Sequence, residues 1–268
     1  MEVKSENIKY KADDDEISAQ LSQPSAQGSY PGVVLIHEIF GLDGHTRSVA
    51  ERLAAEGYIV LAPHLFSSKK LSKTLTDEGI GEAMKFMMSI PPEKQRDEKY
   101  REEQMAKLSE DKRNMVIGVY TTLFIDRPVE LFTSYLSYAV EHLKTVKGFN
   151  GKVGSAGFCF GGGMSINLGC TGKTDATVIF YGENPSPIDK VKDAKCAVMG
   201  LYGGEDARIN SNIDQLVKAL VENRRPFTIK VFPGAHHAFF NSDRPQTYNR
   251  DAAEESWRML LKFFKDNL

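Results

Sequence analysis

A cysteine between two glycines is the feature of this sequence that points most directly to chemistry. Cys159 lies two residues after Gly157 and two residues before Gly161. A strand, a tight turn and a helix start are expected here, and the residue on such a turn takes a strained conformation with positive φ. The flanking glycines are needed because a Cβ at either position would collide with it. A thiol beside a helix N-terminus favours its thiolate, so we expect acyl transfer through a thioester.

Two later residues could activate the thiol. Asp206 follows an apolar, strand-like run and His237 follows the last such run, which gives the order nucleophile, acid, histidine. His237 is expected to take or share the thiol proton, and Asp206 to orient the ring and stabilise its charged form. Two rivals stay open, because Glu205 is a neighbouring acid and His236 a neighbouring base. Asp206 could instead be a turn or helix N-cap residue.

The loop after the first long apolar run carries a further group of candidates. Backbone N–H groups of Ile39 and of the Phe40 loop, together with that of Phe160, are expected to bind a developing oxyanion. Glu38 then falls beside the thiol. It is either an exposed loop carboxylate or a charge that competes for the proton of the thiol or of the histidine. His37 is expected to be structural, although it lies near the expected pocket.

Strands that alternate with helices are expected to position these residues. Continuous β-branched and apolar runs predict strands buried on both faces, and helices of ten or more residues between them predict a mostly parallel sheet with helices on both faces. No internal repeat or linker is visible, so we expect one α/β domain over residues 1–268. Two short antiparallel strands are expected at Val3–Tyr10 and Glu16–Leu21. The expected buried strands are Pro31–His37, Tyr58–Ala62, Lys152–Ala156, Ala176–Tyr181, Ala197–Tyr202 and Thr228–Phe232. The expected helices are Asp43–Glu56, Phe132–Lys147, Phe160–Leu168, Ser211–Asn223 and Ala252–Asn267.

One stretch does not fit this alternation and is expected to be a charged helical insertion, around residues 67–127. It contains an apolar helical segment with Met84, Phe86, Met87 and Met88, a Pro91-Pro92 break, and a run of both charge signs from Glu93 to Arg113. It is either a solvated helical excursion with modest ion-pair support, or a lid whose apolar side chains face the active site.

Composition narrows the class of protein. The chain has 268 residues, 41% hydrophobic and 26% charged, with a net charge of −2 and a pI of about 6.3. These values are ordinary for a globular protein and do not suggest a nucleic acid or a membrane as partner. No apolar run is long enough to span a membrane, and the N-terminus lacks the apolar stretch of a signal peptide. Three cysteines without a CxxC pair disfavour a disulfide framework or a zinc site, so we expect a cytoplasmic protein.

Taken together, these residues resemble the dienelactone hydrolase (carboxymethylenebutenolidase) family of the α/β-hydrolase superfamily. The resemblance spans about residues 5–265, and the charged insertion stands apart from it. It rests on five segments: His37 to Leu42, Tyr58 to Phe66, Gly157 to Gly162, Tyr202 to Asp206, and Pro233 to Asn241 with the terminal helix that follows.

The resemblance implies an α/β-hydrolase fold and a triad of Cys159, Asp206 and His237, with His237 preferred to His236. It also implies that Glu38 accepts the thiol proton when substrate binds, so that the thiol is mostly neutral at rest. The implied reaction opens an enol-lactone without metal or organic cofactor.

One departure from the family pattern concerns the substrate. The family places a carboxylate-binding arginine four residues after the histidine, and this sequence has Asn241 there, with Arg244 further on. Arg208, Asn241 and Phe40 are therefore the candidate substrate-binding residues. The ligand is expected to be a small lactone or ester, and the sequence carries no sign of the oligomeric state.

Other functions stay open at this point. A general carboxylesterase or thioesterase would use the same triad on a different substrate. A redox-regulatory thiol would use Cys159 without hydrolysis, but it would need no acid and histidine partners. A binding module with a relic triad, or a Cys159 that only packs, does not explain the complete set of residues.

Overall fold

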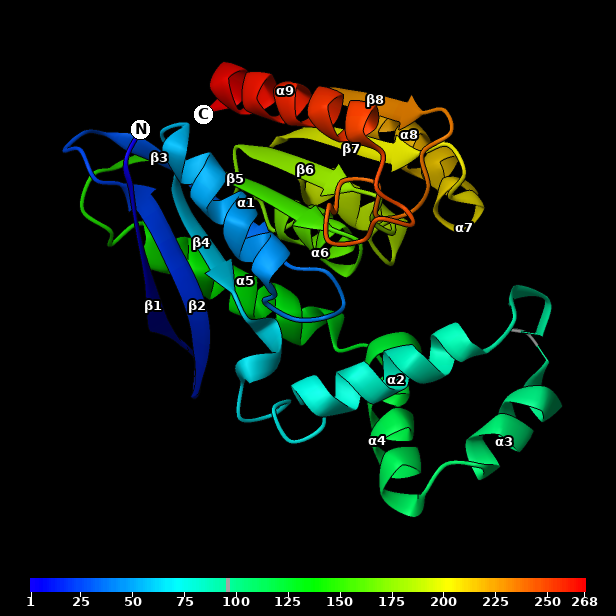
Figure 1. The fold of residues 1–268 in the computed structure, drawn as a ribbon. Coiled ribbons are helices and arrows are strands. Elements are labelled where there is room, and N and C mark those ends of the chain that lie inside the picture. The colour runs from blue at the N-terminus through cyan, green and yellow to red at the C-terminus, as the bar shows by residue number, and fades with distance from the viewer. Residues whose placement is uncertain (95–96) are drawn as a thin grey trace. The chain divides into compact units, whose positions relative to one another are not determined.

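The computed structural model describes residues 1–94 and 97–268 and is organised around one eight-stranded sheet (Figure 1). The strand order is β1-β2-β4-β3-β5-β6-β7-β8. The first two strands run antiparallel to their neighbours, and β3 to β8 are parallel. The predicted mostly parallel α/β sheet is confirmed, with all eight expected strands. Their bounds are β1 Val3–Ala12, β2 Asp15–Pro24, β3 Tyr30–Ile36, β4 Ile59–Pro63, β5 Phe149–Phe158, β6 Ala176–Phe180, β7 Ala197–Gly203 and β8 Phe227–Phe232. The last strand, β8, was expected to be buried, but it lies at the edge of the sheet and most of its residues are exposed or half-buried.

Helices cover both faces of the sheet, as expected (Figure 1). On one face, α1 and α9 pack over a core rich in aromatic rings, in which Phe158, Phe180 and Phe240 are in mutual contact. On the other face, α6 and α8 enclose a smaller aliphatic core, and α5 packs beside α6. Each fully buried large apolar side chain of these cores contributes roughly 1.5–3 kcal/mol to the free energy of unfolding. The bounds are α1 Gly44–Ala55, α5 Val129–Leu143, α6 Phe160–Gly169, α7 Ala207–Asn210, α8 Ile213–Glu222 and α9 Arg250–Asn267.

Strand register brings the candidate residues to one edge of the sheet. Ile36 at the end of β3 is paired with Gly157 in β5, and Phe158 is paired with Phe180 at the end of β6. Gly203 at the end of β7 is paired with Phe232 at the end of β8. The segments that leave these strands therefore start side by side, at the carboxyl edge where open α/β sheets bind ligands.

Contacts divide the chain into two compact units, which we call the sheet unit (Met1–Leu65 and Val129–Leu268) and the helical unit (Phe66–Pro128). The helical unit covers the stretch expected to be an insertion. Its helices are α2 Asp77–Ser89, α3 Glu98–Ala106 and α4 Glu110–Tyr120, followed by a π-helical turn at Thr121–Ile125. The expected charged run includes Gln95 and Arg96, which lie outside the described residues.

Polar caps and ion pairs support the helical unit. The Thr76 side chain caps α2, and the Asp97 side chain caps α3. Glu82 forms ion pairs with Lys85 and Lys112, and such pairs near the surface contribute little. Met88 is 78% exposed. The lid interpretation of this unit stays a prediction.

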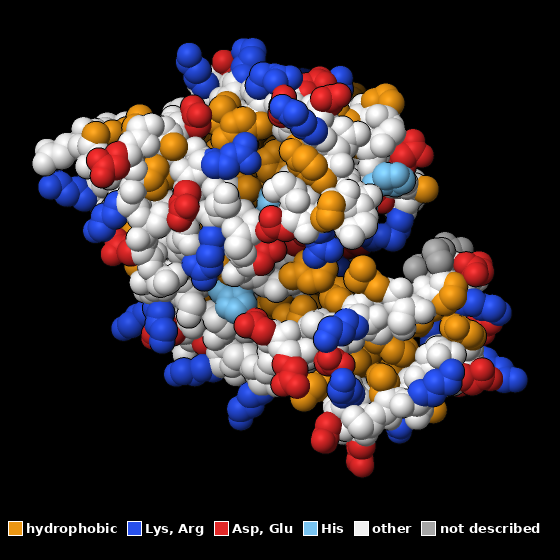
Figure 2. Space-filling view, in the orientation of Figure 1, with side chains coloured by type: hydrophobic (Ala, Val, Ile, Leu, Met, Phe, Trp, Pro, Cys, Tyr) orange, Lys and Arg blue, Asp and Glu red, His pale blue; other side chains and the backbone are white. Residues whose placement is uncertain are grey.

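Charged side chains of both signs are interspersed over the visible surface of each unit (Figure 2). This pattern agrees with the small net charge of −2. No helix in the described part of the chain is long and apolar enough to span a membrane.

Candidate active site

Cys159 lies on a sharp turn between β5 and α6. Its backbone angles are φ +54° and ψ −116°, a conformation that costs roughly 1–3 kcal/mol for a residue with a side chain. A Cβ on Gly157 would collide with the carbonyl of Gly161, and a Cβ on Gly161 would collide with the carbonyls of Ile36 and His37. The glycines are therefore required for the turn to close, but the nearest atoms that a Cβ would meet are these backbone carbonyls and not Cys159, with which a collision was expected. The Cys159 side chain is partly exposed rather than buried in the core.

His237 and Asp206 are in direct contact. Asp206 follows β7, and its Oδ2 lies 2.5 Å from Nδ1 of His237. Its Oδ1 accepts a hydrogen bond of 3.4 Å from the backbone N–H of Ile209, so the same residue is also the N-cap of α7. The two rivals from the sequence, Glu205 and His236, are both exposed. The structure therefore brings Asp206 and His237 together and leaves their neighbours at the surface.

The His237 ring is held in its protonated form by its partners. Burial alone would lower the pKa of His237, but hydrogen bonds to Asp206 and to the Cys159 side chain outweigh it and raise the pKa to about 10. The ring thus connects the aspartate on one side with the sulfur on the other. This is the arrangement in which an imidazole exchanges a proton with a nucleophile.

Glu38 is buried, with 1% of its surface exposed, so it is not an exposed loop carboxylate. Its Oε1 accepts a hydrogen bond of 3.2 Å from the Tyr181 hydroxyl, and its Oε2 accepts one of 3.1 Å from Nδ2 of Asn241. Nε of Arg244 lies 3.5 Å from Oε2. Burial raises the pKa of Glu38, while Arg244 and Asn241 act in the opposite direction. Glu38 is therefore an enclosed carboxylate with a fixed set of partners.

The three candidate substrate-binding residues lie in different surroundings. Asn241 is buried, and both ends of its amide are engaged, since its oxygen accepts a 3.0 Å hydrogen bond from the N–H of Asp243. Arg208 is 64% exposed and pairs with Glu183. Phe40 is partly exposed, and the Arg244 guanidinium lies 3.9 Å above the centre of its ring.

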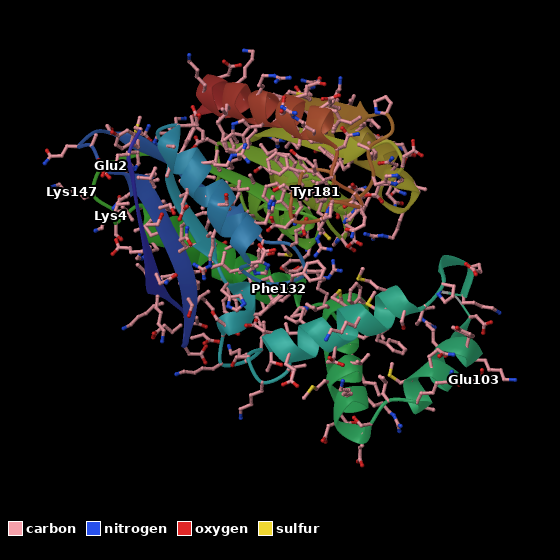
Figure 3. All side chains as sticks on the ribbon, viewed as in Figure 1. Glu2, Lys4, Glu103, Phe132, Lys147 and Tyr181 are labelled. Carbon is pink, nitrogen blue, oxygen red and sulfur yellow. The ribbon has the colours of Figure 1, made fainter. Side chains whose placement is uncertain are left out.

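Tyr181 is a site residue that the sequence analysis treated only as the end of a strand. It follows β6 directly, and Figure 3 labels its side chain. It is fully buried and has a φ of +40°. Besides its hydrogen bond to Glu38, its ring meets the His237 ring edge-on at 5.1 Å between centroids. Its place beside the nucleophile strand was visible in the sequence, but a buried tyrosine there looks like packing.

The expected oxyanion donors follow two neighbouring elements. Ile39 comes after Glu38 in the turn that follows β3, and Phe160 is the first residue of α6. Gly161 lies against the carbonyls at the end of β3, so the two segments are within contact of each other. The first N–H groups of a helix have no acceptor within it, so this edge can receive an anion.

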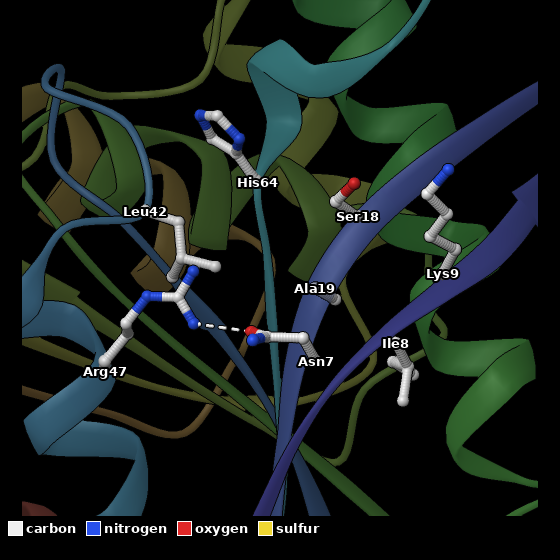
Figure 4. Close-up of a pocket in the computed structure, with 8 residues that line it drawn as sticks. All are labelled: Asn7, Ile8, Lys9, Ser18, Ala19, Leu42, Arg47 and His64. Carbon is white, nitrogen blue, oxygen red and sulfur yellow. Dashed lines mark hydrogen bonds between the residues drawn. The ribbon is translucent and has the colours of Figure 1, made fainter. Parts of the chain in front are cut away.

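A cavity of about 550 Å³ lies elsewhere in the sheet unit (Figure 4). Arg47 extends into it and donates a 2.9 Å hydrogen bond to Asn7. None of the candidate site residues lines it. A second cavity, of about 440 Å³, has Arg208 in its wall. The full lining of the first is Asn7, Ile8, Lys9, Ser18, Ala19, Leu42, Arg47 and His64.

Comparisons with known proteins decide the family. The model of the dienelactone hydrolase family matches residues 17–268. A Saccharolobus solfataricus protein named "Putative carboxymethylenebutenolidase" is 34% identical over 258 residues, which are 96% of this chain and 97% of the relative. The chain belongs to the dienelactone hydrolase family. Membership makes it a carboxylic ester hydrolase of a family that acts on small-molecule esters.

Further comparisons agree with membership of the dienelactone hydrolase family. A Synechocystis protein of the same name is 29% identical over 266 residues, covering 94% of this chain and 93% of the relative. The crystal structure described as "Putative Dienelactone Hydrolase" from Klebsiella pneumoniae matches with a TM-score of 0.77 at 22% identity, covering 99% of both chains. The dienelactone hydrolase from Anabaena variabilis matches with a TM-score of 0.66 at 16% identity, covering 100% of both chains. At 22% and 16% identity, these two structures show that the α/β-hydrolase fold is shared and show nothing beyond the fold.

Proposed function

We propose that this protein hydrolyses an enol-lactone or a related small ester through a thioester on Cys159. The observation that carries the proposal is the strained turn that presents the Cys159 sulfur to a His237 ring, which Asp206 holds from the other side. Such a set of nucleophile, base and orienting acid is what covalent acyl transfer requires.

In the first half of the reaction, the sulfur attacks the ester carbonyl carbon. A carbon–sulfur bond forms and the carbonyl oxygen becomes an oxyanion, to which the backbone N–H groups of Ile39 and Phe160 donate. The carbon–oxygen bond of the leaving group then breaks, which opens the ring of a lactone. An enolate leaves readily because its charge is delocalised, so it needs little help from the His237 proton.

In the second half, water attacks the thioester carbonyl and the same N–H groups stabilise the second oxyanion. The water loses its proton to the released enolate or, where His237 has already given its proton to the leaving group, to the neutral His237 ring. The carbon–sulfur bond breaks, the carboxylate product leaves and the sulfur is regenerated. Preorganised donors of this kind contribute about 2.7–4 kcal/mol each to the lowering of the barrier.

The contact between Glu38 and Arg244 suggests where a carboxylate of the substrate would bind. Arg244 is tied to Glu38 through a 3.5 Å contact and stacks on Phe40 at the same time. We propose that a substrate carboxylate binds Arg244 in place of the arginine that the family has at the Asn241 position. Loss of this partner would leave Glu38 a stronger proton acceptor, because Arg244 acts to lower its pKa.

The test of this proposal is the substitution Cys159→Ala, assayed on a dienelactone and on an aryl ester. Removal of a covalent nucleophile is expected to lower kcat/KM by about 10³-fold or more, or about 4 kcal/mol. Cys170→Ala is the matched control, because Cys170 is a buried thiol at the other end of the same helix. Undiminished turnover by Cys159→Ala would remove the proposal.

A general carboxylesterase or thioesterase is the second candidate. It is favoured by two observations: the Asn241 amide is engaged inside the protein, and Arg208 is paired with Glu183. Dienelactones, neutral aryl esters and thioesters assayed side by side separate the candidates. A preference for the anionic lactone that is lost in Arg244→Gln supports the first, and equal activity on neutral esters supports the second.

We further propose that residues 1–268 act as one α/β-hydrolase domain, with residues 67–127 as an insertion. A cytoplasmic location would suit a catalytic thiol, because a reducing compartment keeps it from oxidation.

A further inference from the structure

His37 binds two backbone groups that belong to different loops. Its Nδ1 lies 2.5 Å from the carbonyl oxygen of Glu38, and its Nε2 lies 3.2 Å from the backbone nitrogen of Leu65. The side chain is fully buried at the end of β3. The contact with Leu65 was not predictable from spacing, because Leu65 follows the next strand of the sheet.

These contacts fix the protonation of the ring. The N–H of Leu65 can only donate, so Nε2 must accept and carries no proton. The proton of the neutral ring therefore lies on Nδ1, from which it is donated to the carbonyl of Glu38. Burial lowers the pKa of His37 to about 4, which keeps this neutral form in place around neutral pH.

The carbonyl that His37 binds belongs to the peptide unit that carries the Ile39 N–H. In a planar trans peptide the C=O and N–H point in opposite directions, so holding one fixes the other. The Gly41 N–H also approaches this carbonyl, at 3.4 Å, across a turn. The Ile39 N–H has no hydrogen-bond acceptor among the residues that the structure describes, although Ile39 is only 7% exposed. Buried N–H groups are rarely left in this state.

We propose that His37 is a positioning residue for the oxyanion hole: it holds the Glu38 carbonyl and so aims the N–H of Ile39 at the developing oxyanion. This inference rests on the proposed acyl-transfer function. The ring is also stacked against the Phe160 ring, at 5.9 Å between centroids and an interplanar angle of 25°, and Phe160 carries the other proposed donor. In this role His37 acts through the peptide that it orients.

The experiment compares an apolar replacement with polar ones. His37→Leu fills the space without donating a hydrogen bond, and kcat for an aryl ester is expected to fall about 10- to 100-fold with KM nearly unchanged. His37→Asn and His37→Gln each offer an amide N–H to the Glu38 carbonyl and are expected to recover most of that loss. Equal kcat in His37→Leu and wild type would overturn the proposal.

A second readout separates positioning from general damage. Alkylation of Cys159 by iodoacetamide displaces iodide and forms no oxyanion, so its rate in His37→Leu is expected to stay within about threefold of wild type. A parallel fall in alkylation and hydrolysis would show instead that His37 supports the whole site. Loss of hydrolysis in Cys159→Ala remains the separate test of the acyl-transfer function itself.

A third measurement needs no variant and therefore does not depend on folding. Nitrogen NMR of the ¹⁵N-histidine-labelled protein reports which ring nitrogen of His37 carries the proton. The proposal requires a protonated Nδ1 and an unprotonated Nε2 at neutral pH. A proton on Nε2 would overturn it, because Nδ1 could then not donate to the Glu38 carbonyl.

Discussion

The two ends of α6 each carry a cysteine, and their surroundings are opposite. Cys159 precedes the first turn, is partly exposed and meets His237. Cys170 is the C-cap residue and is buried, and burial together with the nearby Cys196 raises its pKa to about 12. The helix dipole adds to the contrast, because it favours a thiolate at the N-terminus and disfavours one at the C-terminus. Whether a cysteine of this helix can act as a nucleophile thus depends on its surroundings more than on its residue type.

The largest expected effect on kcat comes from removing the carboxylate of Asp206, which holds the His237 ring. This change makes the surroundings of Cys159 more like those of Cys170. Asp206→Asn cannot stabilise the charged ring and permits the wrong tautomer, so kcat is expected to fall about 10³- to 10⁴-fold. Steady-state hydrolysis of an aryl ester measures the effect. The matched control is Glu205→Gln, since Glu205 is the exposed neighbouring acid. A larger loss in Glu205→Gln than in Asp206→Asn would reverse the assignment.

Alkylation compares the two thiols directly. At pH 7, iodoacetamide is expected to modify Cys159 at least about 10³-fold faster than Cys170, because burial raises the pKa of Cys170 to about 12. Peptide mapping by mass spectrometry gives both rates from one sample. Similar rates would remove the contrast between the two ends of the helix.

The charge of the His237 ring has a pH dependence of its own. Burial lowers the pKa of His237, but its side-chain hydrogen bonds to Asp206 and Cys159 outweigh burial and raise the pKa to about 10, so we expect the ring to keep its proton from pH 6 to 9. Nitrogen NMR of the ¹⁵N-histidine-labelled protein measures this protonation. Loss of the proton near pH 6.5, the ordinary value for histidine, would contradict the prediction.

Glycines at the two ends of α6 give the smallest of the expected effects. A Cβ on Gly161 meets backbone carbonyls, which cannot rotate away, and Gly161→Ala is expected to cost about 3 kcal/mol or more of the free energy of unfolding. A Cβ on Gly169 meets the Thr177 and Cys196 side chains, which can adjust, so Gly169→Ala is expected to cost about 1 kcal/mol. Denaturant unfolding measures both. Equal losses would show that the tight turn does not set the stability of the N-terminal end.

Much of this arrangement follows from local sequence. The apolar runs predict the strands of the parallel part of the sheet. The glycines beside Cys159 predict the turn, because sterics leave few alternatives at such positions. The contact between Asp206 and His237 follows from strand order, which places the carboxyl ends at one edge. The loop after the first long apolar run placed Glu38 beside the thiol, and the resemblance to a family added its role as proton acceptor. No local pattern indicates its burial.

The remaining features depend on contacts between distant loops. His37 appeared structural because its second partner, the Leu65 N–H, lies beyond the next strand. Asn241 was a candidate for the substrate, but the turn after β8 directs its amide to Glu38. Tyr181 was counted as the end of a strand, although its hydroxyl reaches Glu38 from 143 residues away. Such contacts are set by tertiary packing and leave no periodic signal in the sequence.

Trapping the acyl-enzyme tests the central claim most directly. The protein is mixed with excess aryl ester, quenched in acid within one turnover, and mapped by mass spectrometry. We predict an added acyl group on the peptide that contains Cys159, bound as a hydroxylamine-sensitive thioester and absent from Cys170. Full turnover by protein whose Cys159 has already been alkylated, or an acyl group on any other residue, would contradict the account.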